Sequence, residues 1–145
     1  MTNSLIVKND IHIHADPSTV WKVLTEPKYV AQWDELPEDY PEEAMTIGSK
    51  VTWDLPNGGQ TITKVIRAEQ EEELIVDLYV STWDTRPEEG DVVYRYNLKP
   101  HNGETHLFIE IGDFSLVEDG EMYYDASVEF AEEAKKKIKE LSEET

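Results

Sequence analysis

Four turn signals divide the middle of the chain into five short apolar runs, and this spacing constrains the fold most. The turns fall at 56–59, 71–73, 87–90 and 102–103, and two of them contain an Asn-Gly pair. Asn-Gly tolerates the positive φ angles that a two-residue hairpin requires. Within the runs at 47–55, 60–69, 74–83, 91–99 and 105–114, apolar residues alternate with polar ones, as in half-buried strands. Successive hairpins of this kind predict an antiparallel meander.

The segment before these runs predicts a strand that leads directly into two short helices. Ile11 and Ile13 alternate with two histidines, with the two-residue period of a strand. Asp16 is a typical helix N-cap, and Pro17 is suited to the first helical position. Pro27 ends this helix and begins a second one that reaches Trp33. The acidic segment that follows, 34–45, contains two prolines and predicts a loop.

The chain ends with a predicted helix over 121–141. Its inward residues recur at helical spacing: Tyr124, Ser127, Ala131, Ala134, Ile138 and Leu141. The order of elements predicts an α+β fold, in which a curved antiparallel sheet wraps around the long C-terminal helix. The two short helices after the first strand would close one end of the sheet. Residues 1–145 are expected to form a single domain.

Composition restricts the partners that the chain can bind. The formal charge is −19, from 32 acidic and 13 basic residues, so the surface repels nucleic acid and anionic membranes. The sequence contains no cysteine, which excludes disulfides and a thiol nucleophile. No signal segment or long apolar run is visible, which favours a cytoplasmic protein. The acidity is compatible with a soluble surface, a high-salt host or a basic protein partner.

The motifs in this order resemble a known superfamily. They are "ADPSTVWKVLTEPKYVAQW", "IGSKVTW", "VIRAEQEEELIVDLYV" and "THLFIEI", followed by the long helix. Together they resemble the START-like or SRPBCC superfamily, with its helix-grip or birch-pollen-allergen-like fold. Within it, the chain is most similar to homologues of the activator of the heat-shock-protein-ninety ATPase. The resemblance implies a cavity between the sheet and the C-terminal helix that holds a hydrophobic small molecule or lipid.

The alternating residues suggest which side chains would line such a cavity. The candidates are Trp33, Val51, Trp53, Val76, Leu78, Tyr94, Tyr96, Ile109, Tyr124, Ser127 and Ala131. Small residues on the helix against large ones on the sheet fit either close packing or space for a ligand. Buried tyrosine hydroxyls would offer polar anchors to an apolar ligand. Trp33 and Trp83 would line the mouth of the cavity or plug an edge of the sheet.

Metal binding and catalysis are not predicted. His12 and His14 lie on one face of a strand, as zinc ligands sometimes do, but a third ligand would have to come from His106 or an acidic residue elsewhere. With the isoleucines facing the core, these histidines are expected to face solvent, and no metal or other cofactor is assigned. Asp77, Arg95 and Glu110 could serve a cyclase, but their parity places them opposite the apolar residues.

The sequence is compatible with three functions. The first is binding of a hydrophobic or amphipathic small molecule, such as a lipid, a sterol or a polycyclic aromatic compound. The second is a chaperone-associated interaction module that meets a basic protein. The third is an enzyme of the polyketide cyclase or dehydratase kind, which would need a buried titratable pair.

Overall fold

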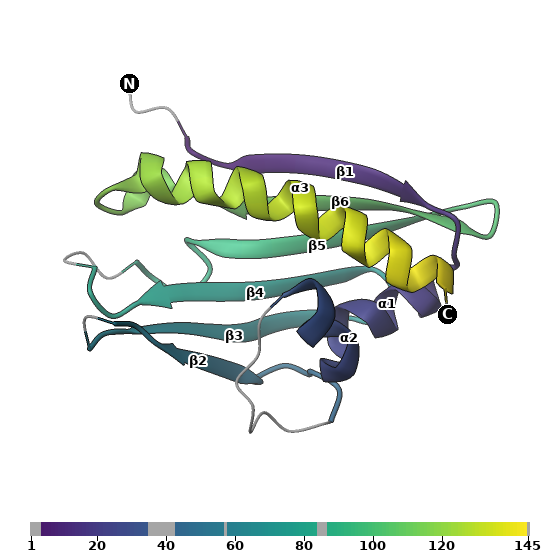
Figure 1. Ribbon diagram of the computed structural model, residues 1–145, viewed down its shortest axis with the longest axis horizontal. Helices are drawn as coiled ribbons and strands as arrows, with labels where there is room; N and C mark the ends of the chain where they lie inside the picture. Colours follow the sequence, from purple (N-terminus) through teal and green to yellow (C-terminus); the bar gives the residue numbers. More distant parts are fainter. Residues whose placement is uncertain (1–3, 35–42, 57, 84–86, 145) are drawn as a thin grey trace.

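The computed structural model describes residues 4–34, 43–56, 58–83 and 87–144 (Figure 1). It is the predicted α+β helix-grip fold. The strands are β1 (Val7–Ile13), β2 (Lys50–Asp54), β3 (Gln60–Glu69), β4 (Glu73–Val80), β5 (Val93–His101) and β6 (Glu104–Gly112). The helices are α1 (Pro17–Thr25), α2 (Pro27–Trp33), the short 3-10 helix η1 (Phe114–Leu116) and α3 (Gly120–Glu144).

The helix cap and the helix break predicted after the first strand are both present in the structure. The Asp16 side chain accepts a hydrogen bond from the backbone N–H of Thr19 at 2.9 Å and so caps α1. Glu26, just before Pro27, is extended, so α1 ends there and α2 begins at the proline. The chain therefore turns from β1 into two short helices within a few residues.

The six strands form one antiparallel sheet in the order β1-β6-β5-β4-β3-β2. Asn102 and Gly103 both have positive φ, as a two-residue turn between β5 and β6 requires. The sequence placed Ile47 in a strand, but β2 begins only at Lys50 and Ile47 is 67% exposed. The first strand is longer than predicted and begins at Val7.

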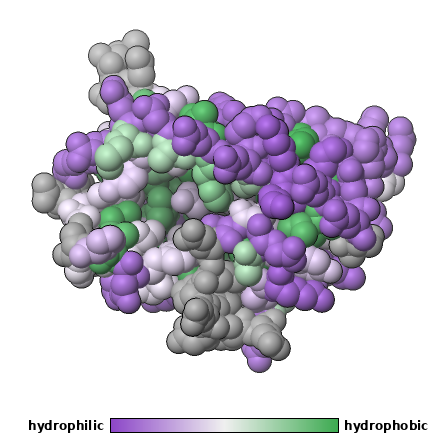
Figure 2. Space-filling model, in the orientation of Figure 1, coloured by the Kyte–Doolittle hydropathy of each residue, from purple (hydrophilic) through white to green (hydrophobic). Residues whose placement is uncertain are grey.

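The helices share one face of the sheet unequally. Helix α3 packs chiefly against β1, at one edge of the sheet, α1 contacts β5 and β6 in the middle, and α2 lies toward the other half (Figure 1). The outer side of α3 is largely hydrophilic, and hydrophobic side chains are visible in the hollow beside it (Figure 2). Ser127, Ala131 and Ala134 are buried, so these small residues let α3 lie close to the sheet. None of the described helices is long and apolar enough to cross a membrane.

The opposite face of the sheet carries charge, as the parity of the strands predicted. Arg95 lies between two carboxylates, 3.8 Å from Glu73 and 3.5 Å from Glu110. Asp77 accepts a hydrogen bond from the backbone N–H of Gly90 at 2.8 Å. Arg95, Asp77 and Glu110 therefore point away from the interior.

The start of α3 depends on a glycine, which gives a test of the packing. A Cβ on Gly120 would overlap the carbonyl oxygen of Phe114, a backbone atom that cannot rotate away. We expect Gly120→Ala to lower the free energy of unfolding by about 2 kcal/mol, as overpacking does. Met122→Ala, at an exposed position in the same helix, should change it by less than about 0.5 kcal/mol. Urea unfolding of both variants checks this, and equal stabilities would contradict the packing described.

Candidate functional site

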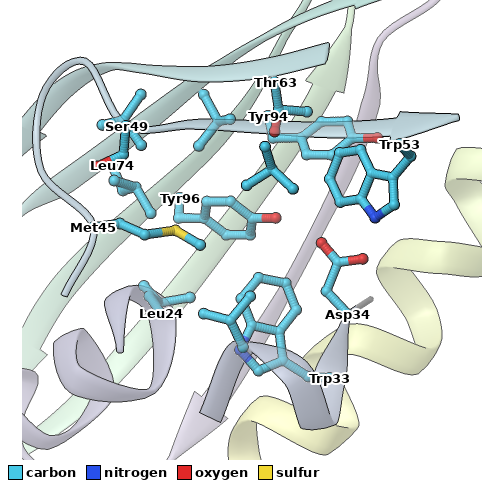
Figure 3. Close-up of a pocket in the computed structure, with 14 residues that line it drawn as sticks. Leu24, Trp33, Asp34, Met45, Ser49, Trp53, Thr63, Leu74, Tyr94 and Tyr96 are labelled. Atoms are coloured by element: carbon cyan, nitrogen blue, oxygen red, sulfur yellow. The ribbon is translucent and has the colours of Figure 1, made fainter. Parts of the chain in front are cut away.

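The interior of the protein contains a small apolar cavity beneath α1 and α2. Its volume is about 40 Å³, room for roughly three water molecules. The cavity is lined by Leu24, Val30, Trp33, Asp34, Met45, Ser49, Val51, Trp53, Thr63, Val65, Leu74, Val76, Tyr94 and Tyr96 (Figure 3). These residues come from α1, α2, the segment before β2, and strands β2 to β5. The cavity thus lies in the half of the sheet that α3 does not cover.

A wider groove adjoins the cavity and shares part of its lining. Trp33, Asp34, Trp53, Thr63 and Tyr94 line both spaces. The groove has a volume of about 600 Å³ and is open to solvent. Phe130 of α3 borders it and stacks on Tyr94, with ring centroids 5.8 Å apart. The cavity and the groove therefore form one larger hollow, of which the cavity is the narrower part.

Polar groups in the cavity converge on its centre. The Asp34 carboxylate, at the end of α2, points into the cavity on the side of the Tyr96 hydroxyl and the Trp53 indole (Figure 3). Burial, with the negative charge of Asp34 as the second cause, raises the pKa of Tyr94 and of Tyr96 above the ordinary value of 10.0. Both phenols are thus neutral hydrogen-bond donors at physiological pH.

Two tryptophans use their indole nitrogens differently. The Trp33 indole N–H donates to the carbonyl oxygen of Val23 at 2.8 Å, and its ring meets Tyr96 edge-on at 5.8 Å. This bond ties the end of α2 to the last turn of α1. The buried Trp53 Nε1 has no hydrogen-bond partner among the described residues. A buried indole N–H without an acceptor is costly, and a bound ligand could supply one.

The structure brings together six of the eleven predicted ligand-binding residues, and whether they bind a ligand stays a prediction. The six are Trp33, Val51, Trp53, Val76, Tyr94 and Tyr96. Leu78, Ile109, Ser127 and Ala131 are buried but do not line the cavity, and Tyr124 on α3 does not either. The described residues of α3 do not line the cavity itself, but Phe130 of α3 borders the adjoining groove, so the predicted location between the sheet and α3 stays a prediction.

Trp83 does not line the described part of the cavity, and its predicted role as a plug at an edge of the sheet stays a prediction. It is buried against Tyr79 and Tyr123, with ring centroids 6.1 and 5.5 Å apart. Sequence reasoning missed Asp34, the one carboxylate among the described residues that line the cavity. Its position directly after Trp33, at the end of a short helix, is the only signal that pointed to it.

The buried phenol of Tyr96 makes stability depend on pH. Because its pKa is raised in the folded state, the unfolded chain loses this proton first, near pH 10, and stability falls as the pH rises further. We expect Tyr96 to contribute a slope of about −1.4 kcal/mol per pH unit above pH 10. Urea unfolding at several pH values should show a shallower decline for Tyr96→Phe than for the unaltered protein. Below pH 9 the two stabilities should run parallel, and identical slopes above pH 10 would contradict the assigned burial.

A family model and several solved structures match this chain, and they agree with the fold described above. The model of the family described as "Activator of Hsp90 ATPase homolog 1-like protein" matches residues 14–143. No curated protein matches the chain. The structure is similar to that of protein MLL2253 from Mesorhizobium loti, with 21% identity, a TM-score of 0.75, and coverage of 97% of this chain and 98% of that one.

Two further solved structures share the fold at lower identity. The Aha1 dimer from Colwellia psychrerythraea is 17% identical, with a TM-score of 0.64 and coverage of 92% of this chain and 96% of that one. DynU16, from the dynemicin biosynthetic locus, is 16% identical, with a TM-score of 0.61 and coverage of 92% and 47%. The family match spans most of the chain, and the fold agrees with it throughout. The chain therefore belongs to the family of activator of Hsp90 ATPase homolog 1-like proteins.

Proposed function

We propose that this protein binds a neutral, largely apolar small molecule in the hollow formed by the cavity and the adjoining groove. The observation that carries the proposal is a largely apolar space lined by the phenols of Tyr94 and Tyr96 and by the Trp53 indole, whose N–H has no partner among the described residues. Sites of this kind derive affinity from apolar surface removed from water, and orientation from a few polar groups.

The dimensions of the hollow limit how a ligand could enter. Ligand pockets usually measure about 300–1,000 Å³, so the cavity of 40 Å³ alone is too small for a sterol or a polycyclic aromatic compound. The groove of 600 Å³ is large enough but is open on one side. A ligand would therefore place its main body in the groove and direct one end toward Tyr96, with some opening of α2 away from β2.

Charge selects among the ligand classes. The described lining of cavity and groove includes two carboxylates, Asp34 and Asp54, and no lysine, arginine or histidine. The whole chain carries a charge of −19. A fatty-acid anion would meet repulsion without a cationic partner. Neutral sterols and polycyclic aromatics with a hydroxyl or carbonyl group fit better, because the phenols can donate to them and Asp34 can accept from them.

An enzyme of the polyketide cyclase kind is the second candidate, and Asp34 is the observation that favours it. A carboxylate among tyrosine hydroxyls in an apolar cavity has the components of an acid–base pair. The fold of DynU16, which comes from a biosynthetic locus, is compatible with this reading. Turnover that depends on pH and disappears in Asp34→Asn would distinguish an enzyme from a carrier.

A chaperone-associated interaction module is the third candidate, suggested by the family description and by the acidic surface. It would act through the outside of the protein rather than through the cavity. An association of this kind should weaken steeply with added salt, because surface charges would carry it.

The binding proposal is tested by an amide-resolved NMR titration against neutral sterols, flavonoids and other polycyclic aromatics, with fatty acids as the anionic arm. We expect saturable shifts at Trp33, Trp53, Tyr94 and Tyr96 with a neutral compound, and at least about tenfold weaker binding of fatty acids. A folded protein in which no compound moves these signals would overturn the proposal.

Two variants locate the binding. Val76→Phe places a larger side chain into the cavity and should weaken binding at least tenfold. Ser127→Val, buried beneath α3 and outside the cavity, should leave the affinity within about twofold. If Ser127→Val weakened binding and Val76→Phe did not, the binding site would lie instead at the interface between the sheet and α3.

A further inference from the structure

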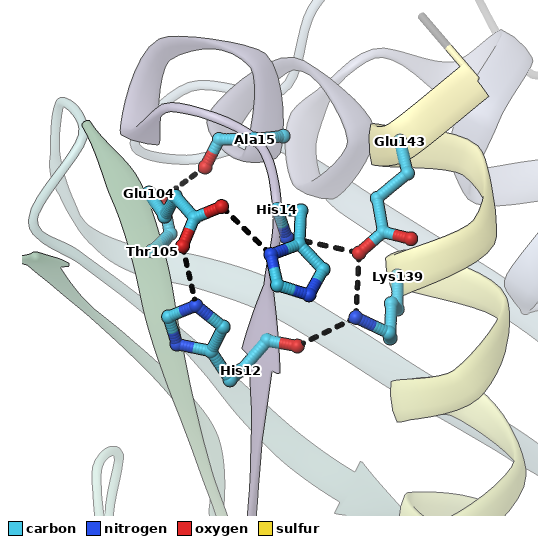
Figure 4. Close-up of polar contacts among 7 residues, drawn as sticks. All are labelled: His12, His14, Ala15, Glu104, Thr105, Lys139 and Glu143. Carbon is cyan, nitrogen blue, oxygen red and sulfur yellow. Dashed lines mark hydrogen bonds and ion pairs between the residues drawn. The ribbon is translucent and has the colours of Figure 1, made fainter. Parts of the chain in front are cut away.

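We propose that His12, His14 and Glu104 form a binding site for a zinc ion on the face of the sheet opposite the cavity. The three side chains come from the end of β1, the residue after it and the start of β6, and they point toward one another (Figure 4). This site is independent of the proposed ligand cavity, with which it shares no residue.

The register of the sheet supplies the third ligand. β1 pairs with β6 so that Ile13 faces Thr105, which brings the next residue, His14, beside Glu104. Glu104 lies 90 residues further along the chain, so the spacing of the sequence could not identify it. The pair of histidines thus gains a carboxylate on the same face.

The distances suit a small divalent cation. One Glu104 oxygen is 2.9 Å from His12 Nε2, and the other is 2.7 Å from His14 Nδ1. The candidate ligand atoms of the three residues all lie within 4.8 Å of one another. In a tetrahedral zinc site, bonds of 2.0–2.2 Å place ligand atoms about 3.3 Å apart. Small side-chain rotations would therefore open a space for the ion.

Two histidines and one glutamate are a ligand set that zinc accepts. Zinc binds imidazole nitrogen and carboxylate oxygen in open sites with three protein ligands, leaving the fourth position to water. The chain has no cysteine and only four histidines, and all four lie near this corner. The rings of His101 and His106 are 6.4 and 6.0 Å from the His12 ring.

The backbone at the two histidines is fixed by hydrogen bonds to side chains of α3 (Figure 4). Lys139 donates to the carbonyl oxygen of His12 at 2.9 Å, and the backbone N–H of His14 donates to Glu143 at 2.9 Å. The Thr105 hydroxyl donates to the carbonyl oxygen of Ala15 at 2.8 Å. Such support lowers the entropic cost of ordering ligands around an ion.

The site is accessible from solvent. His12, Glu104, His101 and His106 line a surface hollow of about 590 Å³. His106 is engaged with Asp10 at 2.6 Å, so it is the less available of the two additional histidines. The charge of −19 raises the local concentration of cations around the protein.

The test uses the untagged full chain after removal of metal by a chelator, with Zn²⁺ alone as the probe. Calorimetric titration should show one Zn²⁺ bound per chain, and thermal unfolding should shift upward by about 5 °C or more at a hundredfold excess over Kd. Co²⁺ bound in the same place should show the strong visible absorption of a tetrahedral complex. Absence of a one-to-one phase would overturn the proposal.

Variants separate this site from loose binding by the acidic surface. His14→Gln and Glu104→Gln should each weaken the one-to-one phase at least about tenfold, whereas His101→Gln should leave it within about threefold. Circular dichroism verifies folding, which these surface changes should preserve. If the ligand variants bind Zn²⁺ as the unaltered protein does, the binding belongs to scattered carboxylates and the assignment is wrong. An equal loss in His101→Gln would also overturn the ligand set.

Discussion

One helix cannot cover a six-stranded sheet, and the interior of this protein follows from that constraint. Five spacings of about 4.8 Å make the sheet about 24 Å wide, whereas a helix with its side chains covers about 10–12 Å. Helix α3 takes the edge formed by β1. The other half depends on α1 and α2, which have nine and seven residues. The cavity lies where this shorter cover meets the sheet.

The two halves of the interior therefore use different packing. Under α3, Ala131, Ala134 and Ile138 are almost fully buried, and small side chains bring the helix close to the sheet. Under α1 and α2, the large rings of Trp33 and Tyr96 meet edge-on and leave space beside them. Small residues against large ones could indicate packing or a cavity. The structure assigns packing to α3 and the cavity to the short helices.

The sequence predicted the faces of the strands better than the position of the cavity. Side chains alternate strictly along a strand, so the apolar pattern correctly placed Val51, Trp53 and Tyr96 on the inner face and Arg95 on the outer face. Helical spacing likewise identified Ser127 and Ala131 as buried.

Alternation does not reveal which helix lies above a given strand, and this is why the sequence did not show that the cavity lies beside α1 and α2. That information comes from the width of the sheet and the order of its strands, both of which depend on contacts distant in the sequence. Glu104 was not predicted as a neighbour of the histidines, because only the pairing of β1 with β6, a contact distant in the sequence, brings it to His14.

The first strand connects the two faces of the protein. Ile13 is buried and Ile11 packs against the core, whereas His12 and His14 lie on the opposite side of the strand. Only Ala15 separates His14 from Asp16, the residue that caps α1. An ion held by His14 would therefore fix the point from which α1 departs toward Leu24 at the cavity. The two sites share no side chain, so any influence of one on the other would have to pass through this short connection and the orientation of α1.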